Sequence, residues 1–197
     1  MTRLINPLTV AALALAPALG VGLLAPAHAA PTLRTAITDP AGDVTDDEDT
    51  AVTAPYADIV SADGRRIGDK LELRYTTAQA LSPLHDPNWD SEDTHTDFTL
   101  DTDNDGKEDF TVAYGLADGA LYAEVTKADD HDDPPVLCTG TATYTNNAHV
   151  ATVPLSCLGN PARAGYQVDT SYDLDAQDDD SPTGSDAAPE AGFADIG

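Results

Sequence analysis

The sequence predicts an all-β protein, built as a single antiparallel β-sandwich of jelly-roll type. Short runs of alternating apolar and polar residues recur along the chain, which is the pattern of strands with one buried face. Turn-forming Gly, Pro, Asn and Asp residues separate these runs, and helical periodicity is almost absent after residue 30. Eight or nine short strands with frequent turns between them are typical of sandwiches and jelly rolls.

The first thirty residues have the pattern of a signal peptide. Arg3 supplies a positive charge, residues 10–25 are apolar, and residues 27–29 form a small-x-small cleavage site. We therefore expect residues 1–29 to be removed, residues 30–172 to form the sandwich, and residues 173–197 to form an acidic, partly disordered tail. No stop-transfer segment follows the apolar run, so we expect a secreted chain without a transmembrane anchor.

The strands themselves are predicted from alternation. Leu71, Leu73 and Tyr75 fall on one face of their run, and Phe98 and Leu100 fall on one face of the next. The remaining runs cover residues 56–63, 110–114, 121–126, 136–145, 148–156 and 164–172. Asn146-Asn147 tolerates the positive φ of a tight turn, so the two runs that flank it are predicted to form a hairpin.

Acidity is the extreme feature of the composition. The chain carries 35 Asp and Glu against 9 Lys and Arg, for a formal net charge of −26. Such a surface makes nucleic acid and anionic lipid poor partners. Bound cations would offset the self-repulsion, while simple solvation of an exported surface explains the charge equally well. Both interpretations stay open at this point.

The densest group of carboxylates lies between two predicted strands, in residues 101–109, with the sequence DTDNDGKED. Calcium takes about six to eight oxygen ligands, which a short chain supplies when alternate residues point inward around a sharp turn. Gly106 would provide that turn. The predicted calcium ligands are side-chain oxygens of Asp101, Asp103, Asp105 and Asp109 and the carbonyl oxygen of Lys107.

The pattern departs from an EF-hand, because Val112 stands where that loop has its bidentate Glu and the flanks are strands. The nine residues D-x-D-x-D-G-x-x-D resemble instead the calcium-binding hairpin loops of integrin-type FG-GAP propellers. The chain has no internal repeat, so this resemblance implies the loop and not the propeller fold. The alternative is a metal-free turn, since Asp, Asn and Gly also favour turns for backbone reasons.

The chain contains two cysteines, Cys138 and Cys157. In an exported protein they most simply form one disulfide. A redox-active pair is the less favoured alternative, because C-x-x-C spacing is lacking.

Several short motifs together resemble exported bacterial β-sandwich modules of the family 9 carbohydrate-binding and DOMON-like type. The motifs are DPAGD at 39–43, Asp58-Ile59, LDTDNDG at 100–106, VPLS followed by Leu158-Gly159, and SDAAP at 185–189. The resemblance implies a single sandwich, often calcium-stabilised, whose relatives bind sugars or other ligands. Some DOMON relatives hold haem through Met and His, and the chain has no Met after residue 29, so haem of that type is not expected.

Two further sites follow from these motifs. Trp89 lies in a loop and is the candidate platform for stacking on a sugar ring; the alternative is that it covers one end of the core. Asp39, Asp43 and Asp58 are candidates for a second cation site if the N-terminal loop folds back, although turn formation explains them nearly as well.

No motif of a known catalytic site appears in the chain. His85-Asp86 and the His95/Asp97 pair can be drawn as acid-base or metal sites, but loop solvation is the favoured role. We expect a non-catalytic, calcium-stabilised module that binds carbohydrate or a cell-envelope polymer. The alternatives are an acidic structural or surface protein without a ligand and, last, an exported hydrolase.

Overall fold

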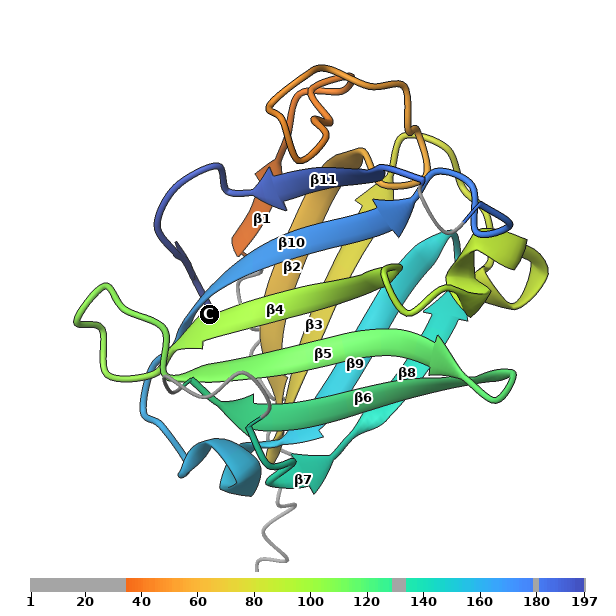
Figure 1. The fold of residues 1–197 in the computed structure, drawn as a ribbon. Coiled ribbons are helices and arrows are strands. Elements are labelled where there is room, and N and C mark those ends of the chain that lie inside the picture. Colours follow the sequence, from red (N-terminus) through yellow and green to blue (C-terminus); the bar gives the residue numbers. More distant parts are fainter. Residues whose placement is uncertain (1–34, 129–133, 179–180, 197) are drawn as a thin grey trace, which may run out of the picture. The chain divides into compact units, whose positions relative to one another are not determined.

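Two antiparallel β-sheets pack face to face, which confirms the predicted all-β sandwich (Figure 1). The computed structural model describes residues 35–128, 134–178 and 181–196, so the predicted signal peptide lies outside the described residues. In Figure 1 the strands of the front sheet cross those of the rear sheet at a steep angle.

The rear sheet has five strands in the order β1-β2-β3-β9-β8. Its strands are β1 (Thr35–Thr38), β2 (Ile59–Ile67), β3 (Lys70–Thr77), β8 (Thr141–Thr145) and β9 (Ala148–Pro154). The β8–β9 hairpin turns at Asn146 and Asn147, whose φ angles are 51° and 59°. The predicted Asn-Asn hairpin is therefore confirmed.

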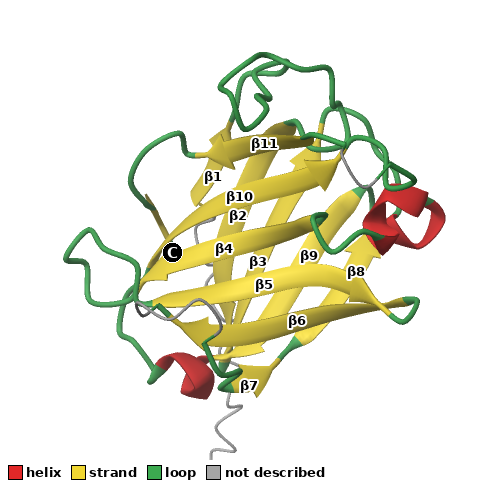
Figure 2. Cartoon of the chain, in the orientation of Figure 1, coloured by secondary structure: helices red, strands yellow, loops and turns green. Residues whose placement is uncertain are grey.

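The front sheet follows the order β11-β10-β4-β5-β6-β7, and a short β12 also pairs with β10. Its strands are β4 (His95–Asp101), β5 (Phe110–Ala117), β6 (Ala120–Lys127), β7 (Cys138–Thr139), β10 (Gly165–Asp173), β11 (Thr183–Ala188) and β12 (Ala194–Asp195). The only helical elements among the described residues are short 3₁₀ turns at the margins (Figure 2): η1 (Pro83–His85), η2 (Pro87–Asp90) and η3 (Leu155–Leu158).

The core lies between the two sheets and follows the predicted alternation. Leu71, Leu73 and Tyr75 of β3 are buried, as are Phe98 and Leu100 of β4. Their neighbours in sequence point outward, because successive side chains of a strand alternate between its faces. Each of these side chains stabilises the fold by roughly 1.5 to 3 kcal/mol through burial.

The prediction of one continuous strand over residues 136–145 is wrong. The run splits at Gly140 into β7 of the front sheet and β8 of the rear sheet. A Cβ at Gly140 would lie 2.4 Å from the carbonyl oxygen of Thr152, so the crossing between the sheets needs a residue without a side chain.

The predicted boundary at residue 172 is also wrong. β10 continues to Asp173, and later residues form β11 and β12, which both pair with β10. The inward positions of β11 hold Gly184, Asp186 and Ala188, which carry little apolar surface. The run therefore lacks the alternation of large apolar residues by which strands are predicted.

Cys138 and Cys157 form a disulfide with a Cα–Cα distance of 6.1 Å, as predicted. The bond joins β7 of the front sheet to η3, which follows β9 of the rear sheet. No helix in the described part of the chain is long and apolar enough to cross a membrane.

Candidate metal centres and the adjoining pocket

Three of the predicted loop ligands come together in the β4–β5 hairpin. Asp101, Asp103 and Asp109 each offer a carboxylate oxygen, and these oxygens lie within 4.8 Å of one another. Such an all-oxygen set can hold a hard cation. Only Asp101 is buried among them, at 3% exposure.

Backbone hydrogen bonds hold this hairpin loop in shape. The two carboxylate oxygens of Asp101 accept from the N–H groups of Asn104, at 2.5 Å, and Gly106, at 2.8 Å. Asn104 and Gly106 adopt positive φ, which these residue types tolerate. Asp109 Oδ2 accepts from both the hydroxyl and the N–H of Thr102, and these bonds lower the pKa of Asp109.

The Asp105 carboxylate does not join this group, so its predicted role as a ligand is corrected, while the role of the Lys107 carbonyl oxygen stays a prediction. Asp105 Oδ1 accepts from the N–H of Lys107 at 2.9 Å, and its other oxygen lies 3.6 Å from the Lys107 ammonium. The two residues therefore pair with each other on the exposed side of the loop. The alternation of the sequence is not kept, because a left-handed residue on either side of Asp105 reverses the chain direction.

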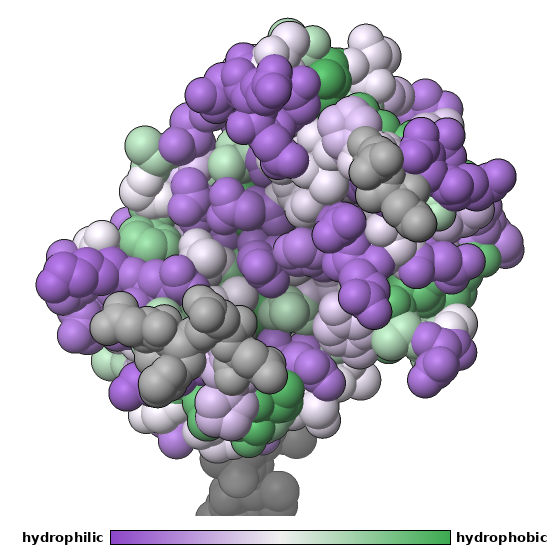
Figure 3. All heavy atoms as spheres, in the orientation of Figure 1, coloured by the Kyte–Doolittle hydropathy of each residue, from purple (hydrophilic) through white to green (hydrophobic). Residues whose placement is uncertain are grey.

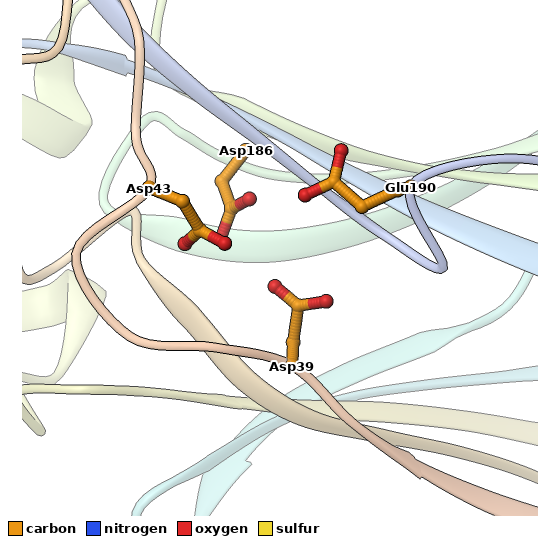
Figure 4. A group of neighbouring side chains, drawn as sticks. All are labelled: Asp39, Asp43, Asp186 and Glu190. Carbon is orange, nitrogen blue, oxygen red and sulfur yellow. The ribbon is translucent and has the colours of Figure 1, made fainter.

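A second group has four carboxylates, from Asp39, Asp43, Asp186 and Glu190. One oxygen of each lies within 4.8 Å of the others. Figure 4 shows the four side chains pointing toward a common centre from two separate segments of the chain. We call these four residues the clasp, because they join the loop after β1 to the segment around β11.

Local backbone contacts bring the two halves of the clasp together. Thr45 and Ser185 exchange N–H···O=C hydrogen bonds of 3.0 and 2.8 Å, which places the 39–55 loop along the outer edge of β11. Asp186 points inward from β11, and its Oδ2 accepts from the N–H of Ile59 at 2.6 Å. Gly42 lies between Asp39 and Asp43 with φ of +89° and donates its N–H to Asp58 Oδ2.

The clasp and the adjacent Asp58 hold carboxylate oxygens that lack a hydrogen-bond donor. Asp39 Oδ2, Asp43 Oδ1 and Asp58 Oδ1 are buried atoms that have no partner within the described residues. Asp58 is only 5% exposed and lies within electrostatic range of both Asp39 and Asp43. Buried polar atoms normally have partners, so these three oxygens could bind a cation.

The electrostatics of the clasp favour such a cation. Burial, and then the neighbouring carboxylates, raise the pKa of Asp39 to about 6 and that of Asp186 to about 7. Burial also raises the pKa of Asp58. Ionised carboxylates this close together repel one another, and a cation among them would reverse that effect.

Asp39 and Asp43 lie together as predicted, but the rest of the predicted second site differs. Asp58 lies beside the clasp, where its hydrogen bond to Gly42 supports the loop. Asp186 and Glu190 complete the group, and the sequence analysis missed both as ligands. One signal was available in the sequence. Asp186 alternates with the small residues Gly184 and Ala188, so in a strand its charge would share their face.

A pocket of about 410 Å³ adjoins the clasp and is lined by residues of β4, β10, β11 and the neighbouring loops. Asp43, Asp186 and Glu190 belong to both the clasp and the pocket wall. Hydrophilic residues form a band over this part of the front sheet in Figure 3, which continues onto the 39–55 loop. The pocket is therefore polar and acidic.

The floor of the pocket carries a second carboxylate pair. Asp97 of β4 and Asp169 of β10 stand directly opposite each other across the two strands. Burial and the charge of Asp97 raise the pKa of Asp169 to about 6, and burial raises the pKa of Asp97. His95 Nε2 lies 3.9 Å from Asp97 Oδ2, so this sequence pair does meet, at the pocket wall.

The other candidate pair takes a structural role. Asp86 is buried, accepts from the Tyr172 hydroxyl at 2.8 Å and caps η2 through the N–H of Asn88. His85 is exposed on the adjacent turn. Both carboxylate oxygens of Asp86 therefore have structural partners, Tyr172 and Asn88.

Trp89 does not form a surface platform, so its predicted ligand-binding role is corrected. The side chain is 3% exposed and packs edge-on against Tyr114 and nearly parallel to His149, at centroid distances of 5.8 and 5.4 Å. The alternative interpretation, that Trp89 closes one end of the core, is the one that the structure shows. η2 carries it there because Asp86 caps that turn.

Comparisons with known proteins do not place the chain in a family. No protein-family model matches it, and neither the curated proteins nor the solved structures contain a significant match. The clasp, the hairpin loop and the pocket are therefore the features that bear on function.

Proposed function

We propose that this protein is an exported, non-catalytic β-sandwich module that binds calcium and uses its polar front face to bind carbohydrate or a cell-envelope polymer. The observation that carries the proposal is the clasp. Four carboxylates converge there, and three buried oxygens in and beside it lack a hydrogen-bond donor in the described part of the chain.

Calcium is the cation that suits these ligands best. Both groups offer only carboxylate oxygens, which hard cations prefer, whereas zinc and copper favour His and Cys. Magnesium demands a near-ideal octahedron and retains its waters, while calcium accepts irregular shells of about six to eight oxygens. Extracellular calcium sites typically have dissociation constants on the order of 10⁻⁴ to 10⁻³ M, and we expect that range here.

The cation would stabilise the fold by linking two distant segments of the chain. The clasp joins residues 39–43 to residues 186–190, which lie more than a hundred residues apart in the sequence. Binding that occurs only in the folded state adds RT ln(1 + [L]/Kd) to the free energy of unfolding. The hairpin loop is the weaker of the two sites, because Asp101 and Asp109 already accept backbone N–H groups there.

The carbohydrate part of the proposal has two supports. The segments that supply the clasp, DPAGD and SDAAP, are among the motifs by which the chain resembles family 9 carbohydrate-binding and DOMON-like modules. The pocket beside the clasp also presents acceptors and hydroxyl groups, among them Asp97, Asp169, Ser171 and Ser185. Export accords with the disulfide, since disulfides persist in oxidising compartments.

The experiment that tests calcium binding is a titration by calorimetry, paired with melting curves in calcium and in chelator. We expect Asp43→Asn to remove most of the calcium-dependent rise in melting temperature, and Asp109→Asn to remove a smaller part. Asp105→Asn is the matched control, because it makes the same charge change in the hairpin loop outside the three-carboxylate group. An absence of binding heat together with identical melting in calcium and chelator would refute the proposal.

A further inference from the structure

The clasp and the pocket share a wall, and this shared wall limits what the pocket can bind. Asp43, Asp186 and Glu190 belong to both, whereas Asp39 belongs to the clasp alone. Glu190 is exposed and Asp186 is buried, so the clasp has a closed side toward the core and an open side toward the pocket.

A cation held by the clasp would have free coordination positions on that open side. The four clasp residues offer one oxygen each within mutual reach, against about six to eight that calcium takes. The cation itself is indicated by more than the crowding of acids. Asp58, 5% exposed and within electrostatic range of Asp39 and Asp43, keeps Oδ1 without a donor in the described residues.

The rest of the pocket wall presents hydrogen-bond acceptors and hydroxyls. Asp97 and Asp169 stand opposite each other, with Ser171 and Ser185 nearby on β10 and β11. Among the described residues neither Lys nor Arg lines the pocket, and the basic side chain that does, His95, lies 3.9 Å from Asp97. A group bound against Asp97 and Asp169 must therefore donate hydrogen bonds and must not be an anion.

A hydroxyl group meets both demands. An amine donates to carboxylates, but a protonated amine has no lone pair for a cation. A carboxylate or phosphate ligates calcium, but Asp97 and Asp169 repel it. A hydroxyl ligates calcium through its oxygen and donates its proton to a carboxylate, and adjacent hydroxyls do so in pairs.

We propose that the pocket and the clasp form one composite site for a neutral saccharide, in which two adjacent sugar hydroxyls complete the shell of the clasp cation and others donate to Asp97 and Asp169. This inference rests on the proposed binding of calcium by the clasp. It adds the ligand class and makes sugar binding depend on the cation, so that calcium has a recognition role as well as a structural one.

The test measures sugar binding with and without calcium. Saturation-transfer difference NMR is recorded with a panel of methyl pyranosides that carry adjacent hydroxyls in cis and trans arrangements, in calcium and in chelator. Spermidine and inorganic phosphate serve as the amine and anion probes. The variants are Glu190→Gln in the clasp and the double variant Asp97→Asn/Asp169→Asn in the pocket floor. Glu92→Gln is the control, because it makes the same change at an exposed site outside the pocket.

We expect at least one pyranoside to bind in calcium and its affinity to fall by about tenfold or more in chelator and in Glu190→Gln. The double variant should lose affinity to a similar degree while keeping the calcium-dependent rise in melting temperature. Glu92→Gln should match the wild type in both.

Four results overturn the inference, and they differ from failure of calcium binding itself. The first is that calcium raises the melting temperature but no pyranoside binds. That result would retain the proposed calcium binding and reject the saccharide site. Equal sugar binding in chelator removes the role of the cation. Tighter binding of spermidine or phosphate than of any pyranoside identifies another ligand class. Release of methanol from the glycosides shows hydrolysis in place of binding.

Discussion

At the scale of single residues, His149 is the most unusual side chain of the core. It is 2% exposed and stacks on Tyr75 with a centroid distance of 4.4 Å and an interplanar angle of 11°. Trp89 packs on it as well, at 5.4 Å. Burial lowers the pKa of His149 to about 3, so the ring is neutral at physiological pH and works as an aromatic packing element.

This burial predicts a specific dependence of stability on pH. The unfolded chain protonates His149 near pH 6.5, whereas the folded chain resists protonation down to about pH 3. The contribution of His149 to native stability is therefore lost progressively as pH falls through that interval. We expect His149→Phe to lose less stability than the wild type between about pH 7 and about pH 4.5, by roughly 2 to 3 kcal/mol.

Urea unfolding in chelator at the two pH values measures this difference. His85→Gln is the control, because His85 is exposed and should leave the pH dependence of the wild type unchanged. Equal losses of stability in His149→Phe and the wild type would contradict the prediction.

At the scale of elements, the disulfide joins β7, a short strand of the front sheet, to η3, which follows β9 of the rear sheet. β7 is two residues long and ends at Gly140, where the chain leaves the front sheet for the rear one. Cys138 lies in β7, and Cys157 lies in η3 just after β9. The covalent bond therefore holds a short strand that few ladder hydrogen bonds secure.

Removal of this bond should lower the free energy of unfolding. The two cysteines are 19 residues apart, and a loop of that length corresponds to about 3 kcal/mol in the chain-entropy model. We expect a Cys138→Ala/Cys157→Ala double variant to unfold at a lower urea concentration than the wild type. Its free energy of unfolding should be smaller by that amount. The wild type in reducing agent should show a similar loss, and a midpoint equal to that of the oxidised protein would contradict the prediction.

At the scale of the whole molecule, charge opposes folding. The formal net charge is −26, and the clasp, the hairpin loop and the pocket concentrate part of it on the front sheet and its margins. Self-repulsion destabilises a compact state, and dissolved salt screens exposed charges with a Debye length of about 8 to 10 Å near physiological ionic strength.

Monovalent salt and calcium should therefore stabilise the protein in different ways. In chelator, we expect the melting temperature to rise by a few degrees as NaCl increases, because screening weakens the repulsion. The additional rise caused by calcium should persist at high NaCl, because the clasp is partly buried and salt screens it less. Melting curves across a salt series measure both. A calcium effect that disappears at high NaCl would show general screening and contradict binding at the clasp.

Much of the fold was predictable because it depends on local patterns. Phe98 and Leu100 faced the core as their alternation predicted, and Asn146-Asn147 formed the expected turn. The hairpin loop was found for the same reason, since its three grouped carboxylates lie within nine residues. Asp105 was misassigned because side-chain direction in a loop depends on φ at Asn104 and Gly106, which spacing does not give.

The clasp shows what local patterns cannot supply. Asp43 and Asp186 are 143 positions apart, and they meet because Thr45 pairs with Ser185 along the edge of β11. Trp89 was misplaced for a related reason, because its burial depends on Tyr114 and His149, which come from other strands.

The sequence by itself determined the sandwich class, the acidic character and the local group of carboxylates in the β4–β5 hairpin, since each depends on residues that are neighbours along the chain. Only the tertiary structure decided that residues 183–188 complete the front sheet, that four distant carboxylates form the clasp, and that a pocket opens beside it. The physical reason is that weakly apolar strands such as β11 are fixed by hydrogen bonding to β10, and that charged side chains converge only through the packing of distant segments.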